Sequence, residues 1–249
     1  MRTECINGLK IYIVDTDSAE WSLGDGVSGS WSLGDGVDSS VVISQISPAR
    51  RNIFEKMKNE SAKRLSLAAT LALREALSEY GIDEAEQEYE YNEYGRPSLK
   101  SHPEISFSLS HAGTIALAGI LRNSSGRDII ADEGRSCENY PKNLSIGIDI
   151  EEIKRANERI AGRFFSEGEK KMLAEASDYK REFTKIWTAH EAFGKALGTG
   201  LSLPKASYEA VREGSKLYIR YKADGVNCRD YEIFQSDCCE GYIISVCVV

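Results

Sequence analysis

The sequence lacks the features that mark exported and membrane-embedded proteins. Its N-terminal stretch carries an acid at Glu4 and no apolar core of a signal peptide. No stretch approaches the roughly eighteen uninterrupted apolar residues of a membrane span. The six cysteines form no C-x-x-C pair and follow no regular spacing, which argues against a zinc site or a disulfide framework. We therefore expect a cytoplasmic protein with reduced thiols and no membrane contact.

Acidic side chains outnumber basic ones. The chain has 31 Lys and Arg against 39 Asp and Glu, a formal net charge of −8, which argues against a general nucleic-acid binder. Its 249 residues, 41% of them hydrophobic, are enough for one large domain or two small ones with a real core. Any anionic ligand must therefore be met by a local basic patch.

One such patch follows Pro48. Residues 50–64 contain six basic and two acidic side chains, a local charge of +4. The segment is predicted to be helical and to lead into a helix over 62–80, which Gly81 ends. The alternative is a solvated helix face, because charge runs commonly serve solubility.

The stretch Ile146–Glu152 is predicted to be a strand, because apolar and glycine positions alternate with or flank its carboxylates. Residues two apart share a face of an extended chain, so Asp149 and Glu151 point the same way. Paired carboxylates repel each other unless a proton or a cation lies between them, and hard oxygen ligands suit Mg²⁺. The alternative is a half-buried strand whose polar face meets water.

A helix is predicted from Tyr179 to Leu197. At about 100° per residue, its apolar side chains form one stripe, which we expect to face the core. A second stripe carries Glu191 and Lys195 at i, i+4, which by default form a solvated surface pair. Beside the Asp149 strand, they would instead supply a third acid for a metal and a cation for a phosphate. The core stripe comprises Phe183, Ile186, Trp187, His190, Phe193 and Leu197, and the second comprises Thr184, Thr188, Glu191 and Lys195.

Together these motifs resemble those of the surfactin-type (Sfp-type) 4′-phosphopantetheinyl transferases. The resemblance rests on the D-x-E strand, R-F-F-S at 163–166 with Glu169 following, W-x-x-x-E-A-x-x-K at 187–195 and G-T-G-L-S-L-P at 198–204. It runs from about Ser47 to the C-terminus, with an insertion near residues 123–144.

The resemblance implies an enzyme that transfers 4′-phosphopantetheine from coenzyme A to a serine of an apo acyl or peptidyl carrier protein. The reaction would depend on Mg²⁺, with Mn²⁺ as the alternative metal, and would release adenosine 3′,5′-bisphosphate. The carrier would be a small acidic helical bundle of fatty-acid, polyketide or nonribosomal-peptide synthesis. The rival hypotheses are a non-catalytic module that binds coenzyme A or carrier protein, and a Mg²⁺-dependent phosphodiesterase.

The resemblance also implies roles for individual residues. Asp149, Glu151 and Glu191 would hold the metal, Lys195 and His111 would neutralise phosphate oxygens, and a carboxylate, for which we choose Glu191, would take the serine proton. Family members carry G-[KR]-P and S-H-[SA] turns where this chain has Arg96 and Ser110. The expected catalytic residues are Glu191, Lys195 and His111, and those expected to bind coenzyme A are Arg50, Arg51, Arg64, Ser66, Arg96, Ser110, His111 and Lys195.

One position departs from the family pattern. The family usually has W-x-x-K-E-A, and this chain has His190 in place of the lysine. Imidazole is mostly neutral near pH 7, so one hypothesis is a slower enzyme or a shifted pH optimum. The alternative is a core histidine, because the periodicity places His190 on the apolar stripe.

Strands and helices alternate in two similar series, which predicts an α+β fold of two similar α/β subdomains. The expected division is an N-terminal subdomain over 1–122, an inserted loop over 123–144 and a C-terminal subdomain over 145–249. The resemblance implies a monomer with a pseudo-twofold relation between the subdomains and the site at their interface.

W-S-L-G-D-G-V occurs at 21–27 and again at 31–37, and we assign it no function. The other expected elements are strands over 9–14, 105–111, 114–121, 208–211, Lys216–Tyr221, 231–235 and Tyr242–Val248, helices over 156–162 and 167–176 with a Ser166–Glu169 capping box, and a hairpin turn at Ala112–Gly113.

Overall fold

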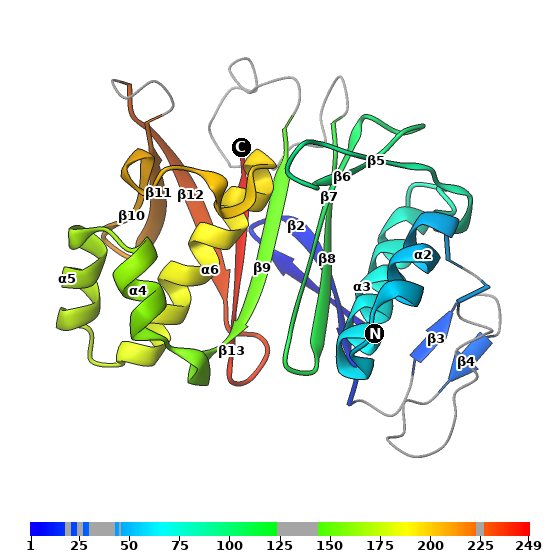
Figure 1. Cartoon of the computed structure of the whole chain (residues 1–249), viewed down its shortest axis with the longest axis horizontal. Helices are drawn as coiled ribbons and strands as arrows, with labels where there is room; N and C mark the ends of the chain where they lie inside the picture. The colour runs from blue at the N-terminus through cyan, green and yellow to red at the C-terminus, as the bar shows by residue number, and fades with distance from the viewer. Residues whose placement is uncertain (18–20, 24–26, 30–42, 45, 124–143, 223–226) are drawn as a thin grey trace. The chain divides into compact units, whose positions relative to one another are not determined.

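The computed structural model describes residues 1–17, 21–23, 27–29, 43–44, 46–123, 144–222 and 227–249. The chain divides into two compact units, one of Met1–Tyr91 with Pro97–Glu133 and one of Asn92–Arg96 with Gly134–Val249. Both contain helices and antiparallel strands, which confirms the expected mixed α+β class (Figure 1). In the ranges described, none of the helices has the length and apolar character needed to cross a bilayer.

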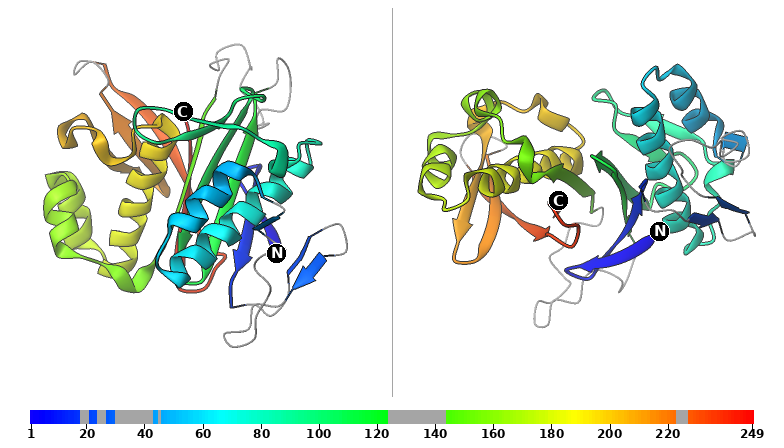
Figure 2. Two further views of the ribbon diagram at one scale, coloured as in Figure 1. Left: turned by 45° about the vertical axis from the view of Figure 1, so that its right-hand side comes forward. Right: turned by 90° about the horizontal axis from the view of Figure 1, so that it is seen from below.

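The first unit is built on an antiparallel sheet in the order β1-β2-β8-β7. Helix α3 (Glu60–Ser78) lies across this sheet, and the small side chains of Ala68, Ala72 and Ala76 let it pack closely. Helix α2 (Pro48–Lys56) packs against α3 (Figure 2). The strands of this sheet are β1 (Arg2–Ile6), β2 (Leu9–Asp15), β7 (Ile105–Ala112) and β8 (Ile115–Arg122). Smaller elements are the pairs β3 (Trp21–Leu23) with β4 (Val27–Gly29) and β5 (Tyr89–Tyr91) with β6 (Pro97–Leu99), and the 3-10 helix Glu84–Glu86.

The second unit repeats this construction with a five-stranded antiparallel sheet in the order β10-β11-β12-β13-β9. Helix α6 (Tyr179–Leu197) lies against β9 and β13, and α5 packs against α6 and β10 (Figure 1). The sheet strands are β9 (Ile146–Glu152), β10 (Tyr208–Glu213), β11 (Lys216–Tyr221), β12 (Arg229–Ser236) and β13 (Tyr242–Val248). The other helices are α4 (Glu158–Phe164), α5 (Glu167–Glu175) and the 3-10 turns Ile153–Arg155, Gly200–Ser202 and Lys205–Ser207.

Gly147 sets how closely α6 approaches β9. A Cβ atom on Gly147 would lie 2.0 Å from the carbonyl oxygen of Ala192 and 2.4 Å from the backbone nitrogen of Ala196. Only glycine fits so near a helix backbone. Since Asp149 and Glu151 follow at two-residue intervals on the same strand face, they also face α6.

Most expected elements form where the patterns place them, and the differences have local causes. The helix Tyr179–Leu197 and the strands Lys216–Tyr221 and Tyr242–Val248 are confirmed with the same bounds. The helical region after Pro48 is confirmed as α2, and the following helix begins at Glu60, two residues earlier than expected, because Asn59 caps it through the backbone N–H of Ala62 (2.9 Å). The hairpin turn is one residue later than expected, because Ala112 still pairs with Ile115. Strand β1 was not predicted, and the second W-S-L-G-D-G-V copy and most of the expected insertion lie outside the described residues.

Candidate catalytic site

The candidate site in the second unit contains two acidic residues of β9. Asp149 is 4% exposed, and Glu151 is half-buried. The indole N–H of Trp187, on α6, donates to Glu151 Oε1 at 3.4 Å. The periodicity predicted only a core position for Trp187. Because Trp187 lies one helical turn before Glu191, its indole N–H also reaches Glu151.

Glu191 and Lys195 extend from α6 toward the same acids. Lys195 Nζ donates to Asp149 Oδ1 at 2.7 Å. Burial, with the charges of Asp149 and Glu151 beside it, raises the pKa of Glu191 to about 7, and Lys195 opposes this rise. The alternative of a solvated surface pair is therefore wrong, and three carboxylates and one ammonium interact in this part of the unit.

The donor chemistry of this cluster suits a hard divalent cation. All three acids offer carboxylate oxygens, and a cation would relieve the repulsion that raises the pKa of Glu191. Among the described residues, however, no three acidic, His or Cys side chains converge closely enough to form a complete metal site. Asp149 is ion-paired with Lys195 instead, so metal ligation by Asp149, Glu151 and Glu191 stays a prediction.

His190 lies in the core, away from these acids. It is 1% exposed, its Nε2 lies 2.5 Å from Glu169 Oε1, and its ring packs edge-on against Phe165 and Tyr208. The sequence contained no signal for the contact with Glu169, because the two residues are 21 positions apart and meet only when α5 packs on α6. The position where the family usually has lysine thus faces a buried carboxylate.

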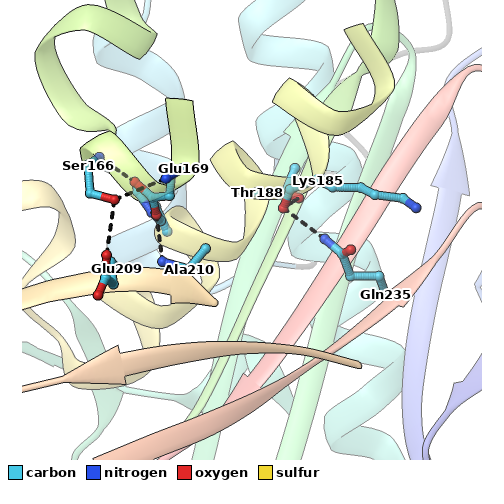
Figure 3. A network of polar contacts seen from close by, with 8 residues as sticks. Ser166, Glu169, Lys185, Thr188, Glu209, Ala210 and Gln235 are labelled. Atoms are coloured by element: carbon cyan, nitrogen blue, oxygen red, sulfur yellow. Dashed lines mark hydrogen bonds and ion pairs between the residues drawn. The ribbon is translucent and has the colours of Figure 1, made fainter. Parts of the chain in front are cut away.

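Glu169 joins three elements. It completes the expected capping box with Ser166, which is confirmed, and its Oε1 accepts a hydrogen bond from the backbone N–H of Ala210 on β10 at 2.5 Å (Figure 3). Burial pushes its pKa upward, but the bonds from His190 and from the backbone amides of Ala210 and Ser166 outweigh this and lower the pKa. Glu169 is therefore a structural acid, as its capping role predicted.

Polar contacts also fix α6 on the sheet. The Thr188 hydroxyl on α6 lies 2.7 Å from the Ser245 hydroxyl on β13. Gln235, on β12, donates to the carbonyl oxygen of Lys185 at 2.8 Å (Figure 3). It also donates to Ser245 Oγ at 2.9 Å. Buried polar groups with partners specify one register, so these bonds hold Glu191 and Lys195 over β9.

The turn at residues 92–96 belongs to the second unit and caps the end of α6. Arg96 Nη1 donates to the carbonyl oxygen of Ala196 at 2.9 Å, and Asn92 Nδ2 donates to that of Gly198 at 2.8 Å. These bonds satisfy carbonyl groups at the negative end of the helix dipole. Arg96 therefore has a structural contact that the sequence did not reveal, and its expected role toward coenzyme A stays a prediction.

The remaining predicted residues lie in the first unit. Arg50 and Arg51 are on α2, and Arg64 and Ser66 are on α3, all four half-buried. Arg51 Nη2 donates to the carbonyl oxygen of Ile46 at 3.2 Å, so part of its guanidinium serves the backbone. Ser110 is buried and His111 exposed at the end of β7, near the hairpin turn.

Comparison with known proteins supports one family. Residues 145–247 match the model of the 4′-phosphopantetheinyl transferase superfamily. The chain is 29% identical over 169 residues to the 4′-phosphopantetheinyl transferase Sfp of Bacillus subtilis strain 168, a match that covers 67% of this chain and 66% of that protein. A second transferase from Bacillus subtilis is 31% identical over 67% of this chain and 62% of its own length. A third, ffp, is 26% identical over 83% of both chains.

The matched region contains β9, α4, α5, α6 and the four strands that complete the sheet. Over this region the chain is similar to the 4′-phosphopantetheinyl transferase superfamily, and one of the relatives named above is the transferase Sfp itself. The matches span just under two thirds of the first two relatives.

Proposed function

We propose that this protein transfers 4′-phosphopantetheine from coenzyme A to a serine hydroxyl of an apo acyl or peptidyl carrier protein and releases adenosine 3′,5′-bisphosphate. The observation that carries the proposal is the cluster of Asp149, Glu151, Glu191 and Lys195 inside the region that matches the family. Three interacting acids with one ammonium are groups that phosphoryl transfer uses for charge stabilisation.

In this reaction the serine oxygen forms a bond to the β-phosphorus while the bond from that phosphorus to the bridging oxygen breaks. The negative charge then lies on the α-phosphate of the leaving nucleotide, and the serine proton passes to a base. We assign the base to Glu191, a carboxylate on the helix that carries Lys195. Lys195 and His111 would bind phosphate oxygens and stabilise their growing charge.

Asp149, Glu151 and Glu191 would hold the Mg²⁺ or Mn²⁺ that the family implies. That ion, when bound, neutralises pyrophosphate charge. Lys195 donates to Asp149 in the structure, so the ammonium that would bind a phosphate oxygen lies beside the acids assigned to the metal.

We assign the nucleotide end of coenzyme A to Arg50, Arg51, Arg64 and Ser66, with contributions from Ser110 and Arg96. Guanidinium groups bind phosphate through paired N–H donors. Residues 50–64, which contain these arginines, form a positively charged segment in a chain that is acidic as a whole. The carrier protein would be acidic as well, so docking would use local basic and apolar groups rather than net charge. The proposal places the enzyme in the cytoplasm as a monomer.

Intact-protein mass spectrometry of an apo carrier protein tests the proposal. The carrier is incubated with this protein, coenzyme A and Mg²⁺, with a chelator in a matched control. One added phosphopantetheine, about 340 Da, that is absent with chelator would support the transferase. Coenzyme A binding without any added mass across several carriers would favour a binding module, and coenzyme A cleavage without an acceptor would favour a phosphodiesterase.

A further inference from the structure

A carboxylate with no exposed surface lies in the first unit, far along the chain from the catalytic acids. Glu84, in the 3-10 helix Glu84–Glu86, is 0% exposed. Its Oε2 accepts from the Ser47 backbone N–H at 2.9 Å, and its Oε1 accepts from the Ser47 hydroxyl at 2.7 Å and the Tyr89 hydroxyl at 2.7 Å. No Lys or Arg of the described chain forms an ion pair with it, so three hydrogen bonds offset the cost of burying this group.

Two of those three bonds go to the residue at which α2 begins. Ser47 is itself 0% exposed and is the N-cap of α2. Its hydroxyl oxygen accepts from the backbone N–H of Arg50 at 3.4 Å, and its carbonyl oxygen accepts from that of Arg51 at 2.9 Å. Glu84 thus holds both the backbone and the side chain of the cap, which fixes where the helix starts and how its first turn is directed.

The side chain of Arg50 is held by a hydrogen bond to α3. Its Nε donates to the Thr70 hydroxyl at 3.2 Å, and Thr70, 2% exposed, donates in turn to the carbonyl oxygen of Ser66 at 2.8 Å. Within the described chain these contacts use Nε alone, which leaves both Nη groups for a ligand. A guanidinium fixed through Nε presents a pre-oriented pair of donors, the geometry that a phosphate accepts.

The same network links Arg50 to Glu84 electrostatically. Burial and the charge of Glu84 raise the pKa of Tyr89, and the positive charge of Arg50 acts in the opposite sense on the same hydroxyl. Arg50 therefore lies near the Tyr89–Glu84 contact.

We propose that Glu84 is a positioning residue that, through Ser47, orients Arg50 for recognition of the 3′-phosphate of coenzyme A. The inference rests on the proposed function for the identity of the ligand. Glu84 itself touches no ligand. It sets the first turn of α2, and Arg50 makes the contact that distinguishes a 3′-phosphorylated nucleotide from one without that group.

Calorimetric titration of the full chain with coenzyme A and with 3′-dephospho-coenzyme A tests this, because the ratio of the two dissociation constants isolates the 3′-phosphate. We expect the wild type to prefer coenzyme A by about tenfold or more, as a charge-assisted pair would give. Glu84→Gln keeps one of the two oxygen atoms that accept hydrogen bonds in the wild type. The change should weaken binding of coenzyme A but not of 3′-dephospho-coenzyme A, and so reduce the preference for coenzyme A about threefold to tenfold. Arg50→Ala should abolish the preference.

Tyr89→Phe is the matched control. It removes one of the three donors to the same buried carboxylate but leaves both bonds to Ser47, so it should lower the melting temperature and keep the preference. If circular dichroism shows that Glu84→Gln is unfolded, Ser47→Ala replaces it, because that change removes the hydroxyl link and keeps Glu84 bonded to Tyr89.

If Glu84→Gln weakened the binding of both ligands equally, Glu84 would have only a structural role, and the proposal would be overturned. A wild type that binds both ligands alike, or neither, would overturn it as well. The titrations do not require turnover, so a protein that prefers coenzyme A yet modifies no carrier would contradict the proposed function and leave this inference standing.

Discussion

Lys195 Nζ donates to Asp149 Oδ1 at 2.7 Å, across the contact between α6 and β9. Asp149 has a 6% exposed side chain and Lys195 a 29% exposed one, so the buried acid is compensated by a cation that still reaches the surface. This pair joins the two motifs that the sequence presents 46 residues apart. It also places an ammonium beside the acids that we assign to the metal.

Lys195→Met tests the pair. Removing the ammonium leaves Asp149 buried beside Glu151 and Glu191, so we expect the free energy of unfolding of the metal-free protein at pH 7 to fall by about 1–2 kcal/mol. Urea denaturation measures the change. Lys171→Met is the control, because Lys171 is 76% exposed in its pair with Glu175 and should contribute little. Equal, small effects at the two positions would contradict the structural role of the Lys195 contact.

Glu191 gives a pH dependence with a definite sign. Its pKa is raised to about 7 in the folded protein, so the folded state binds this proton more tightly than the unfolded state does. Its contribution to stability is fully present below about pH 4.5 and is lost as pH rises through 7. The metal-free wild type should lose on the order of 2 kcal/mol between these limits relative to Glu191→Gln. Parallel stability profiles for the two proteins over this range would contradict the assignment.

His190→Lys separates the two hypotheses for the departure from the family pattern. Because His190 contacts Glu169, we expect lysine there to keep a buried partner and to leave the transfer rate within about twofold. A rate increase of tenfold or a displaced pH optimum would show that the histidine limits catalysis.

His190→Ala is the companion variant. It leaves Glu169 without its imidazole partner and opens a cavity beside Phe165, so we expect a loss of about 2–4 kcal/mol in stability. Thermal unfolding would show this loss as a lower melting temperature.

Gly147→Ala tests the close approach of α6 to β9. The new methyl would lie 2.0 Å from a backbone oxygen that cannot move without shifting the helix, so we expect a loss of about 3 kcal/mol or more, or failure to fold. Gly162, inside α4, provides the control, because a Cβ atom added there would meet nothing within 4 Å. Gly162→Ala should raise stability by about 0.5–1 kcal/mol, because alanine favours the helix. Chemical denaturation of both variants measures these changes. Equal changes in the free energy of unfolding would contradict the close packing of α6 on β9.

The sequence predicted the parts of this fold that depend on local pattern. Periodicity placed α6 at Tyr179–Leu197, and alternation placed β9 with Asp149 and Glu151 on one face, because helix and strand geometry repeat along the chain itself. The capping box of Ser166 and Glu169 was predictable for the same reason.

Long-range packing was not predictable. The contact between Glu169 and His190, the capping of α6 by Arg96 and the burial of Glu84 under Ser47 all join residues from separate elements. No periodicity relates such residues, and each contact exists only once helices have packed on sheets. For Arg96, the sequence therefore indicated only a role toward a ligand, although the structure also gives its guanidinium a partner within the protein.

The most direct test compares the wild type with Glu191→Gln in the carrier-modification assay, at saturating coenzyme A and Mg²⁺. We expect the wild type to add one phosphopantetheine to each apo carrier, and Glu191→Gln to be slower by at least about a hundredfold with little change in coenzyme A affinity. A Glu191→Gln enzyme that modifies the carrier at the wild-type rate would contradict the assignment of catalysis to the acids of β9 and α6.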